Sequence, residues 1–139
     1  MDIAPVSVTR TLTLELIDAT GAATPLAAEL LYDKSDPYAV AACFRTGLDL
    51  PVRWVFARDL LAEGLYEPTG DGDVHVWPCL DPRGHAVVII ELSSPDGEAL
   101  LQASSAEVCE FLLRAEAVVP KGTEGDHLDV DDALTRLLS

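Results

Sequence analysis

The sequence lacks clustered positive charge, which excludes one broad class of partner. Nine lysine and arginine residues stand against 24 aspartate and glutamate residues, giving a formal net charge of −15. The cations are scattered, and no two are adjacent. Because proteins hold nucleic-acid phosphates and anionic lipid headgroups with grouped lysine and arginine, we expect no nucleic-acid partner and no attraction to an anionic membrane surface.

Long apolar runs are also missing. The longest, residues 38–44, is far shorter than the roughly 20 residues of a membrane span. The first eight residues carry neither the positive charge nor the apolar stretch of a signal peptide. We therefore expect a cytoplasmic protein without direct membrane insertion.

Metal and redox motifs are scarce as well. The three cysteines are an odd number without a C-x-x-C pair, which favours buried free thiols in a reducing compartment. No two histidines are spaced as ligands on one helix, and the aspartates of residues 126–132 do not follow the calcium-loop pattern. We expect no metal and no cofactor.

What the sequence does have is aliphatic content. Hydrophobic residues make up 49% of the chain and aromatic residues 6%, so the core must be mostly leucine, valine and alanine. A length of 139 residues fits one domain, residues 1–139, able to fold without disulfides or a metal.

Hydrophobic periodicity predicts an α+β fold. Alternating apolar residues between turn signals indicate an antiparallel meander of about seven strands. These strands are expected at residues 6–17, 26–32, 38–45, 52–57, 73–79, 86–92 and 98–103. Strands 38–45 and 86–92 are apolar on both faces, so one copy of the chain has surplus apolar surface and we expect an oligomer.

Three helices complete the prediction. Residues 58–63 form a short inserted helix, which Gly64 ends by adopting a positive φ. Ser104 and Glu107 form a capping box that begins an amphipathic helix containing Phe111, and Asp129 caps a last helix. The apolar side chains expected in the core or at an interface are Tyr38, Val40, Phe44, Trp54, Trp77 and Phe111.

No catalytic arrangement emerges from the motifs. Asp59 and Glu63 are spaced i, i+4 on the short helix and are the one carboxylate pair that could be posed for acid–base chemistry, but solvated surface charges explain them better. Trp54 and Trp77 could stack on bases of single-stranded nucleic acid, but no basic groove accompanies them. We expect a protein that is not an enzyme.

Several runs together resemble the SsgA-like proteins of sporulating actinomycetes, in order along nearly the whole chain. The runs are DPYAV at residues 36–40, FRTG at 44–47, WVFARDLL at 54–61, VWP at 76–78, LSSP at 92–95 and GEALL at 97–101. The resemblance implies a twisted sheet similar to the Whirly and mitochondrial guide-RNA-binding proteins, assembled as a bell-shaped trimer.

The same resemblance implies a role in cell division without catalysis. Members of this family mark sporulation septa, recruit the tubulin-like FtsZ and promote its polymerisation, and work with SsgA-like paralogues. We therefore expect the chain at the division septum. The candidate partner-binding surface is the exposed side of the short helix and the following turn, with Arg58, Asp59, Glu63, Asp71 and Asp73. The alternative is a single-stranded nucleic-acid binder of the same fold, which the negative charge disfavours.

Overall fold

The computed structural model describes residues 6–45 and 52–127, and its main element is one curled antiparallel sheet. The sheet has eight strands in the order β4-β3-β2-β1-β8-β7-β6-β5. The strands are β1 (Ser7–Ile17), β2 (Ala23–Asp33), β3 (Ala39–Arg45), β4 (Val52–Ala57), β5 (Thr69–Asp71), β6 (Val74–Leu80), β7 (Ala86–Ser94) and β8 (Gly97–Ser104). The helices are α1 (Arg58–Gly64), α2 (Ser105–Val118) and the 3₁₀ helix η1 (Glu124–His127).

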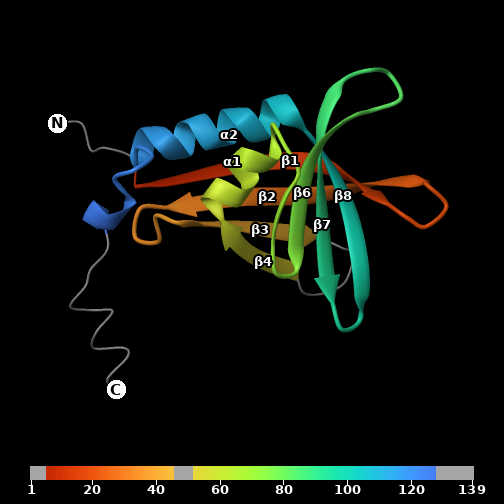
Figure 1. Cartoon of the computed structure of the whole chain (residues 1–139), viewed down its shortest axis with the longest axis horizontal. Helices are drawn as coiled ribbons and strands as arrows, with labels where there is room; N and C mark the ends of the chain where they lie inside the picture. The colour runs from red at the N-terminus through yellow and green to blue at the C-terminus, as the bar shows by residue number, and fades with distance from the viewer. Residues whose placement is uncertain (1–5, 46–51, 128–139) are drawn as a thin grey trace.

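The sheet bends where β1 meets β8. These two strands pair only over residues 15–17 of β1 and 100–102 of β8, whereas β1 pairs with β2 along its whole length. Figure 1 shows the result: strands β1–β4 and strands β6–β8 cross steeply, and α2 lies along β1. Since β8 leads directly into α2, the helix leaves the sheet at the bend and covers the inner face of the curl.

The core lies on that inner face. Alternate residues of each strand point inward, among them Leu12, Leu30, Val40, Val76 and Val88, and all five are buried. Helix α2 adds the stripe that its spacing predicts, Val108, Phe111, Leu112 and Ala115, which is also buried. The outer face of the sheet carries Thr9, Thr11 and Thr13 on β1, and none of the described helices packs on it.

One of the two contacts of the capping box predicted at the start of α2 is confirmed, the one that Ser104 makes to the amide of Glu107. Ser104 has extended backbone angles, and its hydroxyl accepts a hydrogen bond from the amide of Glu107 at 3.3 Å. This contact satisfies one of the amides that the first helical turn leaves without a partner. The capping residue thus marks the point where the chain changes from strand to helix.

Gly64 is needed for a reason that the sequence did not reveal. The predicted positive φ is wrong: Gly64 is the last residue of α1, and Leu65 follows it with φ −68°. A side chain at Gly64 would instead overlap Val76 of β6, whose Cβ lies 2.5 Å from the position of the added carbon. Glycine therefore allows α1 to pack directly on β6.

The predicted strand count of seven is wrong, because β5 was read as part of a turn. Its three residues lie in a Gly/Asp-rich stretch and pair with residues 74–76 of β6. The strand predicted at residues 98–103 is confirmed as β8, and the short inserted helix is confirmed as α1. The 3₁₀ helix η1 was not predicted, and the helix predicted from Asp129 lies outside the described residues.

Candidate functional site

Four of the five predicted surface residues lie on adjoining elements. Asp59 and Glu63 are exposed on α1, and Asp71 and Asp73 are exposed around the turn between β5 and β6. Helix α1 packs beside these strands, and the hydroxyl of Thr69 lies 3.5 Å from a carboxylate oxygen of Glu63. The four carboxylates make this side of the molecule acidic, and within the described residues no hydrogen bond joins Asp59 to Glu63.

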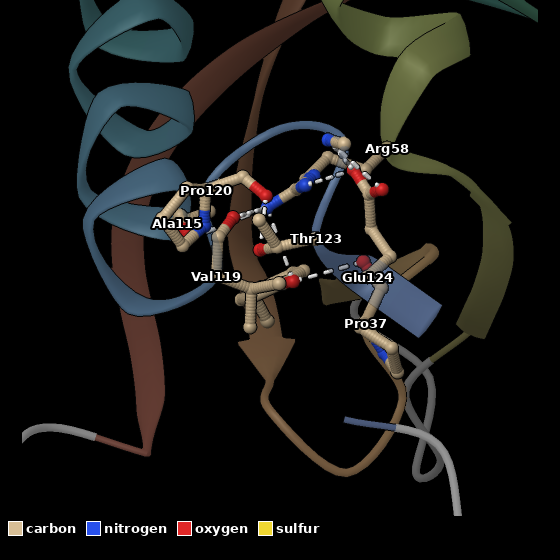
Figure 2. A network of polar contacts seen from close by, with 9 residues as sticks. Pro37, Arg58, Ala115, Val119, Pro120, Thr123 and Glu124 are labelled. Carbon is tan, nitrogen blue, oxygen red and sulfur yellow. Dashed lines mark hydrogen bonds and ion pairs between the residues drawn. The ribbon is translucent and has the colours of Figure 1, made fainter. Parts of the chain in front are cut away.

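Arg58 is not part of that surface, and its predicted exposure is wrong. The residue is only 3% exposed, because it begins α1 at the end of β4 and turns its side chain inward. Figure 2 shows the guanidinium pointing toward the last turn of α2 and toward Glu124. The candidate surface therefore consists of the four carboxylates alone.

The buried guanidinium contacts four residues on three segments: β2, the end of α2 and η1. Nη1 donates to the hydroxyl of Tyr32 at 3.1 Å and to the carbonyl of Val119 at 2.8 Å, and contacts the carbonyl of Ala115 at 3.4 Å. Nη2 forms an ion pair with Glu124 at 2.7 Å. Two carbonyls at the C-terminal end of α2, that of Ala115, which also accepts from the amide of Val119, and that of Val119 itself, thus receive a positively charged donor.

Glu124 is the counter-charge, and it is itself held in place. The carboxylate is 8% exposed and accepts hydrogen bonds from the amide of Gly122 at 3.1 Å. Its own backbone amide and that of Gly122, followed by the Arg58 guanidinium, lower the pKa of the Glu124 carboxyl despite its burial. The carboxyl is therefore ionised at neutral pH and matches the charge of Arg58.

Tyr32 completes the cluster from below the guanidinium. The Arg58 guanidinium carbon lies 5.0 Å from the centre of the Tyr32 ring, and the Tyr32 hydroxyl donates to the carbonyl of Pro37 at 2.8 Å. Burial raises the pKa of this hydroxyl, although the Arg58 charge opposes the shift. A protonated hydroxyl can both accept from Arg58 and donate to Pro37. We call Arg58, Glu124 and Tyr32 the buried ion-pair cluster; every contact it makes is internal.

The six predicted apolar residues divide between core and surface. Val40, Phe44 and Phe111 are buried in the core cluster, and Trp54 is half-buried against it. Trp77 is half-buried on the outer face, opposite Ile89 of β7. Tyr38 is exposed and lies outside the core, so its place at an interface stays a prediction.

One end of the curl has an apolar groove that none of the residues described by the structure fills. The groove has a volume of about 320 Å³ and lies on the inner face between β4 and the turn from β7 to β8. Apolar side chains line most of it: Leu16, Leu26, Phe44, Val52, Trp54, Leu92 and Leu101. Asp96 and Glu98 are the charged residues of its lining, so the groove can hold apolar side chains and attract cations beside them.

A second hollow lies on the outer face of strands β1–β4. Its volume is about 330 Å³, and it forms where the small residues Ala39 and Ala41 stand between Leu31 and Val55. Asp33, Asp36 and Arg53 are its charged lining residues. Because Val52 and Trp54 line the groove while Arg53 and Val55 line this hollow, β4 separates the two.

The described residues contain no group of three histidine, cysteine, aspartate or glutamate side chains positioned to hold a metal. Among the same residues, no helix is long and apolar enough to cross a membrane. The three cysteines are free, but Cys79 is exposed, so the expectation that all three thiols are buried is wrong.

Sequence reasoning missed both the buried ion-pair cluster and the groove. Arg58 and Glu124 are 66 residues apart and belong to no periodic pattern, so no local signal connects them. One local feature indicated that the start of α1 is unusual: the helix follows β4 directly, and Ala57 stands where a polar capping residue is common. The groove depends on how far the two parts of the sheet separate, which strand periodicity does not encode.

Comparison with known proteins identifies close relatives. The family model of the Streptomyces sporulation and cell division protein SsgA matches residues 26–124. The sporulation-specific cell division protein SsgB of Streptomyces coelicolor is 52% identical over 126 residues, 91% of each chain. SsgB of Kineococcus radiotolerans is 52% identical over 127 residues, 91% of this chain and 76% of that one.

Two solved structures share the fold. A structure of SsgB from Streptomyces coelicolor has a TM-score of 0.84 and 50% identity, covering 91% of this chain and 99% of that one. A crystal structure of an SsgA-like sporulation-specific cell division protein from Thermobifida fusca has a TM-score of 0.85 and 43% identity, covering 98% of both. The likeness to Whirly proteins and the trimer stay predictions.

Proposed function

This chain belongs to the SsgA family of sporulation and cell division proteins, and from that premise we propose that it recruits FtsZ to division septa and promotes its polymerisation without catalysing a reaction. Its relatives are named sporulation-specific cell division proteins, which supports a role in cell division. That FtsZ is the partner is what the family resemblance implies.

The observation that carries the proposal is that the charged groups inside the protein bind one another, while the exposed acidic and apolar groups have no internal partner to bind. The one buried charge pair among the described residues, Arg58 with Glu124, makes only internal contacts. Exposed on the surface are four carboxylates beside α1, and at the end of the curl an apolar groove. Such surfaces suit docking of another protein, because apolar area exposed to water is stabilised when a partner covers it.

Sedimentation of FtsZ tests the proposal. Purified FtsZ is polymerised with GTP in the presence and absence of this protein, and the pellet is quantified. We expect more polymer in the pellet and this chain in the same fraction. Unchanged polymer mass together with no co-sedimentation would remove the proposal.

The acidic surface beside α1 is tested in the same assay. The double variant Asp71→Asn with Asp73→Asn removes two charges without changing side-chain size, and Asp18→Asn with Asp126→Asn removes two exposed charges away from this surface and from the groove. If FtsZ uses the surface beside α1, the first variant loses co-sedimentation and the second retains it. Equal behaviour of the two variants would show that this surface is not used.

We further propose that the protein assembles as a homotrimer through the outer face of β6–β8. Trp77 of β6 and Ile89 of β7 lie opposite each other on this face, which no helix among the described elements covers. Light scattering tests the assembly: we expect three times the chain mass of 14.9 kDa, and a mass near 14.9 kDa would contradict it. SsgA-like paralogues are a second class of partner that the family resemblance implies.

A further inference from the structure

Strand β4 is the last strand of the sheet, and one of its edges has no partner strand among residues 6–45 and 52–127. It is the terminal strand of the described sheet and pairs with β3 alone. Open strand edges are sites where another extended chain can add, and proteins usually blunt them with charge, proline or a bulge. On β4 Arg53 is the only charged residue, the described strand contains no proline, and its register with β3 runs without a bulge.

The register identifies which backbone groups face outward. The amide of Arg58 donates to the carbonyl of Tyr38 at 2.7 Å, so residues 58 and 38 form a hydrogen-bonded pair. Antiparallel pairing alternates, so Phe56 and Trp54 also bond toward β3, while Arg53 and Val55 direct their amides and carbonyls away from it. The open edge therefore presents the backbone groups of Arg53 and Val55.

Both faces beside this edge are hollowed: the groove on the inner face is mostly apolar, and the hollow on the outer face mixes apolar with polar and charged residues. Val52, 40% exposed, borders the groove on the inner face, and Val55, 53% exposed, borders the hollow on the outer face. A strand added to β4 would place alternate side chains over each hollow, because successive residues of a strand point to opposite faces. Backbone bonding and side-chain pockets thus coincide at one strand.

The charges around the edge select the occupant. Asp96 and Glu98 line the groove, and Asp33 and Asp36 line the outer hollow, against the single cation Arg53. These carboxylates attract a positively charged segment to the β4 edge and disfavour pairing with the same edge of a second copy, which carries the same carboxylates. An apolar segment with lysine or arginine at alternate positions complements both the shape and the charge.

We propose that β4 and its two hollows bind an extended peptide segment of a partner protein, with apolar residues facing the groove and cations facing the outer carboxylates. The peptide adds as a ninth strand beside β4. The inference goes beyond FtsZ recruitment and holds whichever partner carries the segment.

Fluorescence anisotropy with synthetic peptides tests the proposal. The probe is a short labelled peptide of alternating valine and lysine, and the matched probes replace valine with serine or lysine with glutamate. We expect the valine–lysine probe to bind most tightly, with affinity falling as salt is raised. Equal binding of the serine–lysine probe would overturn the proposal, because it would show general attraction to an acidic protein.

Two variants of the full chain localise the site. Val52→Arg places a cation in the groove, and Leu113→Arg is its matched control on the outward side of α2, where Leu113 is 62% exposed. We expect Val52→Arg to weaken binding of the valine–lysine probe roughly tenfold or more, and Leu113→Arg to leave it near that of the parent chain. Equal affinities of the two variants would overturn the assignment.

A proline tests strand addition itself. Val55→Pro removes an amide that points away from β3, so the β3–β4 ladder keeps its hydrogen bonds while the outer edge loses a donor. Circular dichroism confirms that the variant is folded. Loss of probe binding supports strand addition, and unchanged binding overturns it. A change in molecular mass caused by Val52→Arg would show that another copy of the chain occupies the edge, which would also overturn the proposal.

Discussion

The two ends of strands β2 and β4 differ in the side chains that surround them: one end is polar and buried, and the other is apolar and partly exposed. At one end, Tyr32 of β2 and Arg58, directly after β4, enter the buried ion-pair cluster beneath α2 and η1. At the other end, Leu26 of β2 and Val52 of β4 border a groove that nothing in the described chain fills. We call these the closed end and the open end. The contrast teaches that, around one apolar core, polar contacts close one end of the curl while apolar side chains remain partly exposed at the other.

The closed end should respond most strongly to mutation. Arg58→Ala leaves the Glu124 carboxylate and the carbonyl of Val119 buried without their donor. Breaking one side of a buried ion pair costs about 3–5 kcal/mol, so we expect a loss of that order in the free energy of unfolding by urea. The control is Arg53→Ala at the exposed edge of β4, expected to change stability by less than about 0.5 kcal/mol. Equal effects of the two substitutions would erase the distinction between the ends.

The contact between α1 and β6 should come second. Gly64→Ala forces a methyl group into Val76, and overpacking of this kind costs about 1–3 kcal/mol. Alanine is favoured over glycine in a helix by up to about 1 kcal/mol, so the measured loss is reduced by part of that gain. Gly125→Ala is the control, since its added carbon meets only the Tyr38 hydroxyl at 3.8 Å. A more stable Gly64→Ala protein would show that α1 can move away from β6.

Acid should weaken the closed end through Glu124. The pKa of this carboxyl is lowered in the folded chain, so its stabilising effect is fully present above the ordinary value of 4.5 and is lost as pH falls through the lowered folded value. We expect the unfolding free energies of the parent chain and of Glu124→Gln to converge as pH falls below 4.5. Urea titrations at a series of pH values give the comparison. If the difference in unfolding free energy between the two proteins stayed constant down to the most acidic pH, ionisation of Glu124 would not be its cause.

Substitution at the open end should change the free energy of unfolding least. Val52→Arg exchanges a partly exposed side chain at the mouth of the groove, and we expect a change below about 0.5 kcal/mol in unfolding free energy. The same substitution is expected to weaken peptide binding roughly tenfold or more, so stability and binding separate at this position. A large loss of stability would show that Val52 belongs to the structural core.

Much of this fold follows from local sequence patterns, and the exceptions have physical causes. Alternation identifies β1, because Leu12 and Leu14 face the core while Thr11 and Thr13 face solvent. Ser104 marks the start of α2 for an equally local reason. Strand β5 was missed because three residues are too few to show a period.

The site was less predictable than the fold. Asp59 and Glu63 lie on the surface, as their spacing on a short helix indicated. Arg58, the residue before them, shares that local pattern and yet is buried, because its partner Glu124 is brought near only by the folded chain. The open groove also arises from tertiary structure, since Leu16 and Leu92 come from different parts of the curled sheet.

Amide exchange along β4, measured by NMR with and without the valine–lysine peptide, tests the open end most directly. The account predicts that the amides of Trp54 and Phe56 are protected in the free chain by β3. It predicts that the amide of Val55 exchanges quickly until the peptide is added and slowly thereafter. Protection of Val55 in the free chain, or fast exchange that the peptide does not change, would contradict the account.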